Sequence, residues 1–367
     1  MTLQRSVIAA VILLTAACND SPFEAALWSD GNRLSEQRVS SPSADITVMS
    51  QNLYVGADVD LVIRALATPD PSDDLPALLF AIETLGTTAY PARVEAIADQ
   101  IARARPHAVG LQEVSEINID LRPLGMPVFV SQDFLALLQD ALTRRGLHYT
   151  VAGTSDNINV SLVGGLVSLF DHDVLLVDTD RVTVNAASGQ VFAVNLGPVA
   201  PGVSLIRGWV WAQTTVDGEA YTFATAHTEA NLAGAPPGLV ESVRAAQVGE
   251  MVATLASSER VIVIGDLNDQ PGSPMYNVLT GSGYTDSWAA LHPGAQGLTC
   301  CHNADLADAV AGFDQRIDYI FTRGFARADG KLFGQVDRFG DVPADRLAGP
   351  SSRIWPSDHA GLVAALR

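Results

Sequence analysis

Residues 261–269 read Val-Ile-Val-Ile-Gly-Asp-Leu-Asn-Asp. The four β-branched residues at the start form a continuous apolar run, which is typical of a strand buried on both faces. Gly265 lets this strand end abruptly, and Asp266 and Asn268, two residues apart, point to the same side of the chain. The stretch therefore predicts a buried strand that presents a carboxylate and an amide together at its C-terminal end.

Polar residues end or interrupt apolar strands at further places in the chain. A buried polar group without a partner costs free energy, so these positions are candidates for a functional site. They are Asn52 after Ile46–Met49, Glu113 at the end of Val109–Glu113, His227 after Phe223–Ala226, Asp318 within Arg316–Tyr319, and Asp358 and His359 at the start of the last strand.

Each of these residues also has a purely structural explanation. Because residues of these types recur at the strand ends of one chain, we favour a shared site over a set of unrelated structural roles. The structural alternatives are a turn for residues 265–268, a cap for Asn52, a surface acid for Glu113, an ion pair with Arg316 or Arg323 for Asp318, and a satisfied core imidazole for His227 and for His359.

Predicted helices and strands interleave along the chain without a long linker or an internal repeat. Pro91 opens a helix with Val94, Ile97 and Ile101 on one face, and Pro106 ends it. We therefore predict one domain over residues 44–367, of the α/β (α+β) class. Further helices are predicted in 58–89 around a loop at Pro69–Ser72, at Phe134–Leu142 and at Leu239–Ala256, and short strands at Tyr149–Ala152, Val174–Val177, Val191–Val194, Ile206–Gln213, Ala220–Ala226, Arg260–Ile264, Arg316–Thr322 and His359–Ala365.

The N-terminal residues have the pattern of a signal peptide. Val7–Leu14 is an apolar stretch too short to span a bilayer, and small residues precede Cys18. This cysteine resembles that of the bacterial lipoprotein cleavage box, although Thr15 stands where leucine is usual. We predict an exported chain that is lipid-anchored to the bacterial cell envelope or else secreted, with a signal peptide over residues 1–17 and a flexible tether over residues 18–43.

The chain is acidic, with a net charge of −19 and a single lysine, Lys331. Removal of residues 1–17 takes away one arginine and no acid, so the charge becomes −20. Such a body repels a polyphosphate backbone unless a divalent metal or a local arginine groove compensates. Long nucleic acid is therefore disfavoured as a partner. We also expect the protein to be a monomer.

Cys300 and Cys301 stand side by side, directly before His302. Adjacent Cα atoms lie about 3.8 Å apart across a trans peptide, below the usual disulfide range. Two interpretations stay open. One is a loop pair, including a strained vicinal disulfide in an oxidising compartment, and the other is a soft-metal site with His302 that lacks a fourth ligand.

The ordered set Asn, Glu, His, Gly-Asp-x-Asn, Asp, Ser-Asp-His resembles the endonuclease/exonuclease/phosphatase superfamily. That superfamily includes pancreatic-type deoxyribonucleases, abasic-site endonucleases, neutral sphingomyelinases and inositol phosphatases. The resemblance begins near Ile46, extends to the C-terminus and implies a four-layer sandwich of two packed mixed β-sheets flanked by helices. Five stretches resemble a bacterial secreted or lipoprotein branch: residues 51–58, 110–114, 207–209, 299–301 and 355–361.

The resemblance also implies a metal site and a set of catalytic groups. Glu113 would hold a divalent cation, with Asn52 and Asp358 beside it. Ligation by oxygen alone favours Mg²⁺, with Mn²⁺ or Ca²⁺ as alternatives, over zinc. The cation would neutralise a phosphate oxygen and the leaving oxygen.

The remaining residues of the set would act on the phosphate. Asp266 would position or deprotonate the attacking water, and Asn268 would donate to the phosphoryl oxygens. His359, oriented by Asp318, resembles an acid–imidazole dyad, and His227 would contact the phosphate or assist the leaving group. The residues do not decide whether Asp266 or His359 is the base.

Two further positions stay undecided. The family usually has a polar residue between the glutamate and the first histidine, and residues 171–173 (Asp-His-Asp), ahead of the strand from Val174, are candidates for it or for a solvated turn. Arg207, before Gly208, either binds phosphate or braces the sheet, and we favour bracing.

Taken together, these features predict an exported, divalent-metal-dependent phosphoesterase. A small or lipid-linked substrate, of the sphingomyelinase or phosphoinositide kind, suits the acidic body and the membrane tether better than duplex DNA does. A secreted metal-dependent nuclease is the first alternative. The second is an inactive binding lipoprotein that keeps the fold, which the intact acids and histidines disfavour.

Overall fold

The computed structural model describes residues 46–367 except residues 69, 71, 201, 202, 233 and 327–329. The predicted signal peptide (1–17) and tether (18–43) lie outside the described residues and stay predictions. Among the helices of the described part, none is long and apolar enough to cross a membrane.

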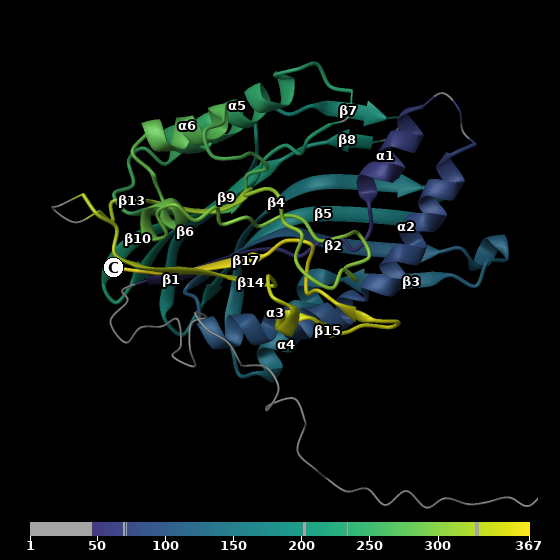
Figure 1. Ribbon diagram of the computed structural model, residues 1–367, viewed down its shortest axis with the longest axis horizontal. Helices are drawn as coiled ribbons and strands as arrows, with labels where there is room; N and C mark the ends of the chain where they lie inside the picture. Colours follow the sequence, from purple (N-terminus) through teal and green to yellow (C-terminus); the bar gives the residue numbers. More distant parts are fainter. Residues whose placement is uncertain (1–45, 69, 71, 201–202, 233, 327–329) are drawn as a thin grey trace, which may run out of the picture. The chain divides into compact units, whose positions relative to one another are not determined.

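Two large sheets carry the fold (Figure 1). The first has seven strands in the order β14-β17-β1-β2-β5-β4, with β3 pairing with β2 off this path. β1 and β2 are parallel, and the neighbouring β17 is antiparallel to β1. Its strands are β1 (Ile46–Asn52), β2 (Ala108–Asp120), β3 (Phe129–Asp133), β4 (Tyr149–Leu162), β5 (Val167–Asp178), β14 (Gly334–Phe339) and β17 (Gly361–Leu366).

The second sheet has six strands in the order β12-β13-β11-β10-β9-β6. β10 and β11 are parallel, and the other pairs are antiparallel, so this sheet is mixed like the first. Its strands are β6 (Val182–Val191), β9 (Gly208–Val216), β10 (Glu219–His227), β11 (Val261–Asp266), β12 (Thr285–Asp286) and β13 (Asp318–Arg323).

Helices and two small hairpins complete the described part. The helices are α1 (Val59–Ala67), α2 (Asp74–Thr88), α3 (Tyr90–Ala104), α4 (Phe134–Arg144), α5 (Leu239–Thr254), α6 (Pro274–Gly281) and α7 (Ser287–Leu291), with 3-10 turns η1 (Arg122–Leu124), η2 (Val163–Gly165) and η3 (Pro343–Asp345). The hairpins pair β7 (Gly197–Ala200) with β8 (Val203–Leu205), and β15 (Leu347–Ala348) with β16 (Arg353–Ile354).

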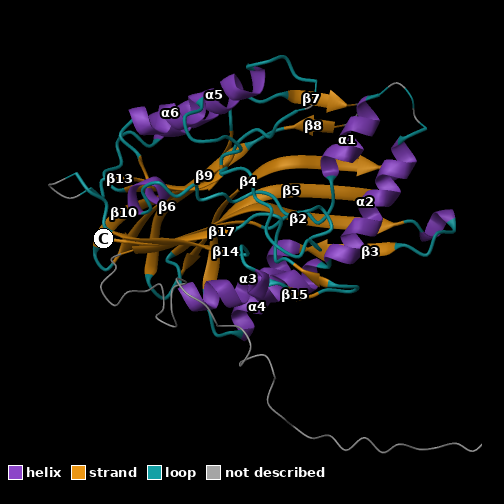
Figure 2. Ribbon diagram, viewed as in Figure 1, coloured by secondary structure: helices purple, strands orange, loops and turns teal. Residues whose placement is uncertain are grey.

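Three apolar clusters separate four layers. Between the sheets, Val48 and Leu175 of the first sheet and Phe223 and Ile262 of the second lie in one buried cluster. A second cluster packs α3 and α4 on the outer face of the first sheet, and a third packs α5 and α6 on the outer face of the second. Figure 2 shows the orange strands between these two pairs of purple helices. The predicted four-layer sandwich is therefore confirmed.

Local sequence explains why most of these elements form where they do. In α3, Pro91 occupies the first turn, and Val94, Ile97 and Ile101 are buried on the sheet. The helix ends at Ala104, ahead of Pro106, because proline cannot continue it. The predicted helices α3, α4 and α5 and the strands β1 and β11 are confirmed.

β4, β5 and β6 differ from the short strands that we predict, whereas β9, β10, β13 and β17 lie close to the predicted bounds. β4 runs to Leu162 instead of ending at Ala152, because two β-bulges let it continue past Gly153 and Asp156. β6 ends at Val191, where we predict a strand to begin. Most side chains of β6 are at least partly exposed at the edge of the sheet, so it lacks the apolar pattern that identifies buried strands.

Candidate active site

The C-terminal ends of the central strands bring the predicted polar residues together. β10 and β11 are in parallel register, so His227 lies opposite Asp266, and β13 places Asp318 opposite Asp266 on its other side. In the first sheet, the end of β1 at Asn52 lies beside Gln112 of β2. These ends meet at a pocket of about 380 Å³, which Glu113, His227 and Asp266 help to line.

A local distortion of β2 turns Glu113 into this pocket. The register of β2 against β5 shifts between Leu111 and Val114, and Glu113 has a left-handed backbone with φ of 55°. A bulge of this kind re-aims a side chain at the price of backbone strain, and such strain gathers at functional sites. Glu113 Oε1 accepts from Asn52 Nδ2 at 3.1 Å, and Oε2 accepts from the Val55 N–H at 2.9 Å.

Asn52 links the two sheets. Its Nδ2 also donates to Asp266 Oδ2 at 3.2 Å, and its Oδ1 accepts from the Tyr54 N–H at 2.9 Å. Burial opposes the ionisation of Glu113, but His227, His359 and the Asn52 amide outweigh it and lower the pKa of Glu113. Glu113 is therefore an ionised carboxylate held in place from both of its oxygens.

The residues at the end of β11 form the turn that the sequence Gly-Asp-x-Asn suggests, and this turn is also part of the site. The Asn268 N–H donates to Asp266 Oδ1 at 3.0 Å, and Asn268 has a left-handed φ of 52°. Burial and the charge of Asp318 raise the pKa of Asp266. Both Asp266 and Asn268 line the pocket, so the turn and the site are the same feature.

Asp318 and His359 form a buried pair, with Asp318 Oδ2 2.9 Å from His359 Nδ1. Burial would lower the pKa of His359, but Asp318, Asp358 and Asp266 outweigh it and hold that pKa well above its usual value. The ring is therefore an imidazolium at neutral pH. The alternative in which Asp318 pairs with an arginine is wrong, because Arg316 pairs with Asp286 and Arg323 donates to main-chain carbonyls.

Arg207 lies in the site, contrary to the expectation that it braces the sheet. Its Nη1 is 3.0 Å from His227 Nδ1, and its Nε is 3.6 Å from Oε1 of the buried Glu229. A guanidinium only donates, so Nδ1 of His227 accepts and its Nε2 carries the proton. Burial and Arg207 lower the pKa of His227. His227 is thus a neutral donor whose Nε2 lies 3.6 Å from Asp266 Oδ2.

Residues 171–173 are not a turn but lie within β5. Asp171 lines the pocket, and Asp173 Oδ1 is 3.6 Å from His227 Nδ1. Asn157 Nδ2 donates to both aspartates, at 3.2 and 2.9 Å. Alternation along a strand turns His172 to the opposite face, where its ring stacks on Phe170. The two aspartates therefore belong to the site and the histidine does not.

The carboxylates at this pocket exceed the neighbouring positive charge. Burial raises the pKa of Asp171 to about 7 and that of Asp358 to about 7, and it holds the pKa of Asp173 well above its usual value. Asp173 Oδ2 and Asp318 Oδ1 are buried without a hydrogen-bond partner. A divalent cation with oxygen ligands fits such a donor set. We call this group the acidic cluster: Glu113, Asp171, Asp173, Asp266, Asp318 and Asp358.

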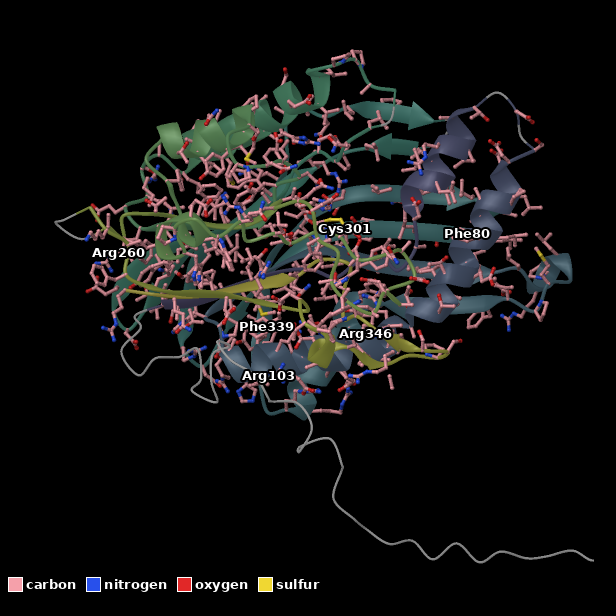
Figure 3. All side chains as sticks on the ribbon, viewed as in Figure 1. Phe80, Arg103, Arg260, Cys301, Phe339 and Arg346 are labelled. Atoms are coloured by element: carbon pink, nitrogen blue, oxygen red, sulfur yellow. A yellow bond between two sulfur atoms is a disulfide. The ribbon has the colours of Figure 1, made fainter. Side chains whose placement is uncertain are left out.

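Cys300 and Cys301 are joined by a disulfide that lines the pocket (Figure 3 labels Cys301 beside the yellow bond). Cys300 is buried with its Sγ 3.6 Å from His359 Nε2, whereas Cys301 is exposed. The grouping of the cysteines with His302 is wrong. Both ring nitrogens of His302 are engaged elsewhere, with Asp308 at 2.9 Å and the Gly340 carbonyl at 2.8 Å.

All the predicted site residues converge in this way. Asn52, Glu113, His227, Asp266, Asn268, Asp318, Asp358 and His359 line the pocket or contact a residue that does. The sequence interpretation missed Asn157, Glu229 and the pocket-facing direction of Arg207. Among the site residues left undecided, only Asp171 and Asp173 could have been identified from the sequence, because residues two apart in a strand lie on the same face.

A family comparison agrees with this geometry. The model of the Endonuclease/Exonuclease/phosphatase family matches residues 50–359. The chain belongs to this family. Enzymes of the family are hydrolases that act on phosphodiester bonds and use divalent metals, typically Mg²⁺. No curated protein sequence matches the chain significantly.

Solved structures of the family share the fold at low sequence identity. A family protein from Bacteroides thetaiotaomicron has a TM-score of 0.53 and 17% identity, covering 88% of this chain and 97% of its own. D. rerio TDP2 complexed with a single-strand DNA product has a TM-score of 0.51 and 16% identity, covering 88% and 98%. The human Nocturnin catalytic domain with bound sulfate has a TM-score of 0.51 and 17% identity, covering 88% and 93%.

Proposed function

We propose that the protein is an exported, divalent-metal-dependent phosphoesterase that hydrolyses a small or lipid-linked phosphoester by attack of water. One observation carries the proposal: an ionised Glu113, a carboxylate base, a neutral histidine donor and an imidazolium surround one pocket. These are the groups that phosphoester hydrolysis requires.

Asp266 is the best candidate for the group that takes the proton of the attacking water. Its pKa is raised, as suits a base working near neutral pH, and Asn52 and the Asn268 N–H fix its two oxygens. His359 is already protonated, so it serves as a charged donor to a phosphoryl oxygen rather than as the base. Water then adds to phosphorus while Asp266 takes its proton.

His227 is placed to support the leaving oxygen. Because Arg207 occupies Nδ1, the Nε2–H is the one that faces the pocket and Asp266. As the bond from phosphorus to the leaving oxygen breaks, this oxygen needs a proton or a hydrogen bond, and the His227 Nε2–H is a neutral donor that lies 3.6 Å from Asp266 Oδ2. Asn268 also lines the pocket, and its Nδ2 donates to the Thr228 carbonyl at 3.1 Å.

Glu113 would hold the metal ion, with Asp358 and Asn52 beside it. Oxygen ligands favour Mg²⁺, Mn²⁺ or Ca²⁺. When bound, such an ion supplies charge stabilisation to the phosphoryl and leaving oxygens.

The substrate class follows from the rest of the pocket. Among the described residues that line it, five carboxylates (Asp58, Glu113, Asp171, Asp266 and Asp358) face two arginines (Arg64 and Arg207). This balance disfavours a polyanion. Apolar side chains from four elements also line it, and they suit an ester with an apolar group: Val59 and Ile63 of α1, Ile158 of β4, Leu169 of β5 and Leu205 of β8.

A nuclease is the second candidate, and one observation favours it. The similar D. rerio TDP2 structure is complexed with a single-strand DNA product, so this fold accommodates single-stranded DNA. A short single strand places fewer charges near the acidic cluster than a duplex does.

Export and lipid attachment at Cys18 belong to the proposal as well. They rest on the N-terminal pattern of the sequence. Incorporation of radiolabelled palmitate by the full-length chain in a bacterial host tests the anchor. Label in the wild type and its loss in Cys18→Ala would support it, and an unlabelled wild type would refute it.

A substrate panel tests the enzyme. The mature protein is incubated with bis(p-nitrophenyl) phosphate, sphingomyelin, phosphoinositides, plasmid DNA and a single-stranded oligonucleotide, in Mg²⁺ and in EDTA. We expect EDTA-sensitive turnover, fastest on an ester with an apolar group. Turnover of DNA alone would replace the proposal with the nuclease, and no EDTA-sensitive turnover by folded protein would refute both.

A further inference from the structure

The disulfide between Cys300 and Cys301 lies against the ring of His359 and has no part in the proposed hydrolysis. We propose that its reduction creates a second metal site, in which Cys300, Cys301 and His359 Nε2 bind a thiophilic ion such as Zn²⁺ or Cd²⁺. These three residues offer ligand atoms that all lie within 4.8 Å of one another. The site differs from the oxygen-ligand site at Glu113 in its donors and in the ions that it would select.

The distance between donors fits a tetrahedral ion. With metal–sulfur and metal–nitrogen bonds of about 2.3 and 2.0–2.1 Å, two ligands of tetrahedral zinc lie about 3.6 Å apart. Cys300 Sγ and His359 Nε2 are 3.6 Å apart. Cys301 Sγ belongs to the adjacent residue, and a small rotation after reduction separates the two sulfurs. Asp266 Oδ2, 3.8 Å from Nε2, or a water supplies the fourth ligand.

The ring of His359 is already oriented as a metal ligand. Histidines that bind metals usually donate their other ring N–H to a carboxylate, which fixes the ring and makes the free nitrogen a better ligand. His359 makes this contact through Nδ1, 2.9 Å from Asp318 Oδ2. Its Nε2 is therefore directed at the sulfurs and the pocket.

The main chain holds the cysteines in register with the histidine. Cys300 forms an isolated β-bridge with His359, and the Ala360 N–H donates to the Thr299 carbonyl at 2.8 Å. The His302 N–H donates to the Asp358 carbonyl at 2.8 Å on the other side of the pair. These contacts do not involve the sulfurs, so they persist when the disulfide is opened.

The chemistry balances with an external reductant. A thiol reductant gives two electrons and two protons to the disulfide and is itself oxidised to a disulfide, leaving two protein thiols. A phosphine reductant reaches the same state while its phosphorus takes an oxygen from water. Cys301 is exposed at the pocket and is the sulfur open to attack. One divalent ion then displaces three protons, one from each thiol and one from Nε2 of the His359 imidazolium.

The consequence for turnover rests on the proposed function. An ion bound through Nε2 takes that nitrogen away from the phosphate, so reduced protein should be inhibited by Zn²⁺, whereas oxidised protein should keep its activity. Binding itself does not depend on the reaction and is measured without substrate.

Cadmium titration after phosphine reduction tests the site. We expect the reduced wild type to bind one Cd²⁺ with thiolate-to-metal charge-transfer absorption, and the oxidised protein to show none. Cys301→Ser and His359→Ala should each weaken binding at least tenfold. The matched control is His148→Ala, which should bind Cd²⁺ like the wild type. The side chain of His148 is 63% exposed, and His148 is distant in sequence from Cys300, Cys301 and His359.

Two results would overturn the proposal. One is reduced wild type that shows no charge-transfer absorption with Cd²⁺. The other is His359→Ala protein that is folded by circular dichroism and binds Cd²⁺ as tightly as the wild type. If His359→Ala does not fold, protection of His359 in the reduced wild type from diethyl pyrocarbonate by Cd²⁺ replaces it, and unprotected His359 refutes the site. These readouts stay informative even if no phosphoester is turned over.

Discussion

Buried charge gathers at both ends of β1 and β2, and the two ends differ in how it is balanced. At the N-terminal end, Asp178 is paired with Arg105 at 3.1 Å and with Arg181 at 2.9 Å, and His107 Nδ1 accepts from the Thr47 N–H at 2.9 Å. Arg105 also lies 3.7 Å from Asp180, so two carboxylates face two arginines. We call these five side chains the balanced cluster: His107, Asp178, Asp180, Arg105 and Arg181. At the C-terminal end lies the acidic cluster.

The acidic cluster has no such balance. Arg93, Arg207 and, at Asp266, Arg244 are arginines that act on its carboxylates, and the Arg93 N–H groups are taken by main-chain carbonyls. His359 adds one further positive charge against six carboxylates. Both ends are buried and polar, so burial of charge does not by itself identify a site. The surplus of one sign does, because a bound cation, or protonation of some of the carboxyls, has to offset it.

The largest expected effect is on turnover. His359→Ala and Asp266→Ala each remove a group that contacts the reacting atoms, so kcat/KM should fall by about 10³-fold or more. Steady-state kinetics on the best substrate of the panel measure this, with circular dichroism to verify folding. His148→Ala is the control and should keep wild-type activity. Loss of less than tenfold in both variants would remove these residues from the mechanism.

Next in size is the stability of the balanced cluster. Asp178 is fully buried, and Asp178→Ala removes the carboxylate that Arg105 and Arg181 share, so that Arg105 keeps only Asp180 at 3.7 Å. Removing one partner of a buried ion pair costs about 3 kcal/mol. We expect that loss in the free energy of unfolding in urea, with no change in metal affinity. A cost below about 0.5 kcal/mol, the size of a surface substitution, would show that the balance does not matter.

The pH dependence of the balanced cluster should be of similar size. Burial and the charge of Arg181 lower the pKa of His107 to about 4. The unfolded chain takes up this proton near its ordinary pKa of about 6.5, so the stabilisation from neutral His107 is complete above about pH 6.5 and is lost as the pH falls towards 4. The shift corresponds to about 3 kcal/mol.

Urea unfolding of wild type and His107→Gln between pH 7.5 and 4 measures this term. Glutamine does not titrate, so the stability difference between the two proteins should shrink or reverse as the pH falls. Parallel curves for the two proteins would contradict the assignment.

The acidic cluster predicts a smaller effect of the opposite sign. Burial, followed by Glu113 and Asp173, raises the pKa of Asp171 to about 7, so ionised Asp171 destabilises the fold as the pH rises from about 4 through 7. In EDTA at pH 8, Asp171→Asn should therefore be more stable than the wild type. We expect about 1–2 kcal/mol, since the amide loses one of the two bonds from Ser115 and Asn157.

Urea unfolding at pH 8 and at pH 4 decides this point. The gain should be absent at pH 4, where the wild-type carboxyl is protonated. A variant that is less stable than the wild type at pH 8 would show that Asp171 is already balanced.

Local patterns predicted the parts of the site that depend on one strand end. The apolar run before Gly265 and the spacing of Asp266 and Asn268 are properties of nine consecutive residues, and the structure has them as predicted. The four layers followed from the resemblance, and the sheet core confirmed them.

Other parts depend on contacts between distant segments. In the sequence, Asp171 and Asp173 resemble a turn, because aspartates are common in turns and uncommon inside buried strands. They lie inside β5 because a pocket faces them, which only the folded structure shows. The direction of Arg207 is set by Glu229 and His227, which lie on another strand or after it. Arginines balance the charge of Asp178, whereas the charge around Asp266 is not balanced. This difference also cannot be predicted from the residues that adjoin either aspartate in the sequence.

The central claim is that the acidic cluster is unbalanced because it binds a divalent cation. Thermal unfolding of the wild type and of Glu113→Gln at pH 7.5, each in EDTA and in Mn²⁺, tests it most directly. Ligand at a hundredfold its Kd stabilises a protein by about 2.7 kcal/mol. We predict a rise of several degrees in Tm for the wild type and little or none for Glu113→Gln. An unchanged Tm for the wild type in Mn²⁺, with no heat of binding in calorimetry, would contradict the claim.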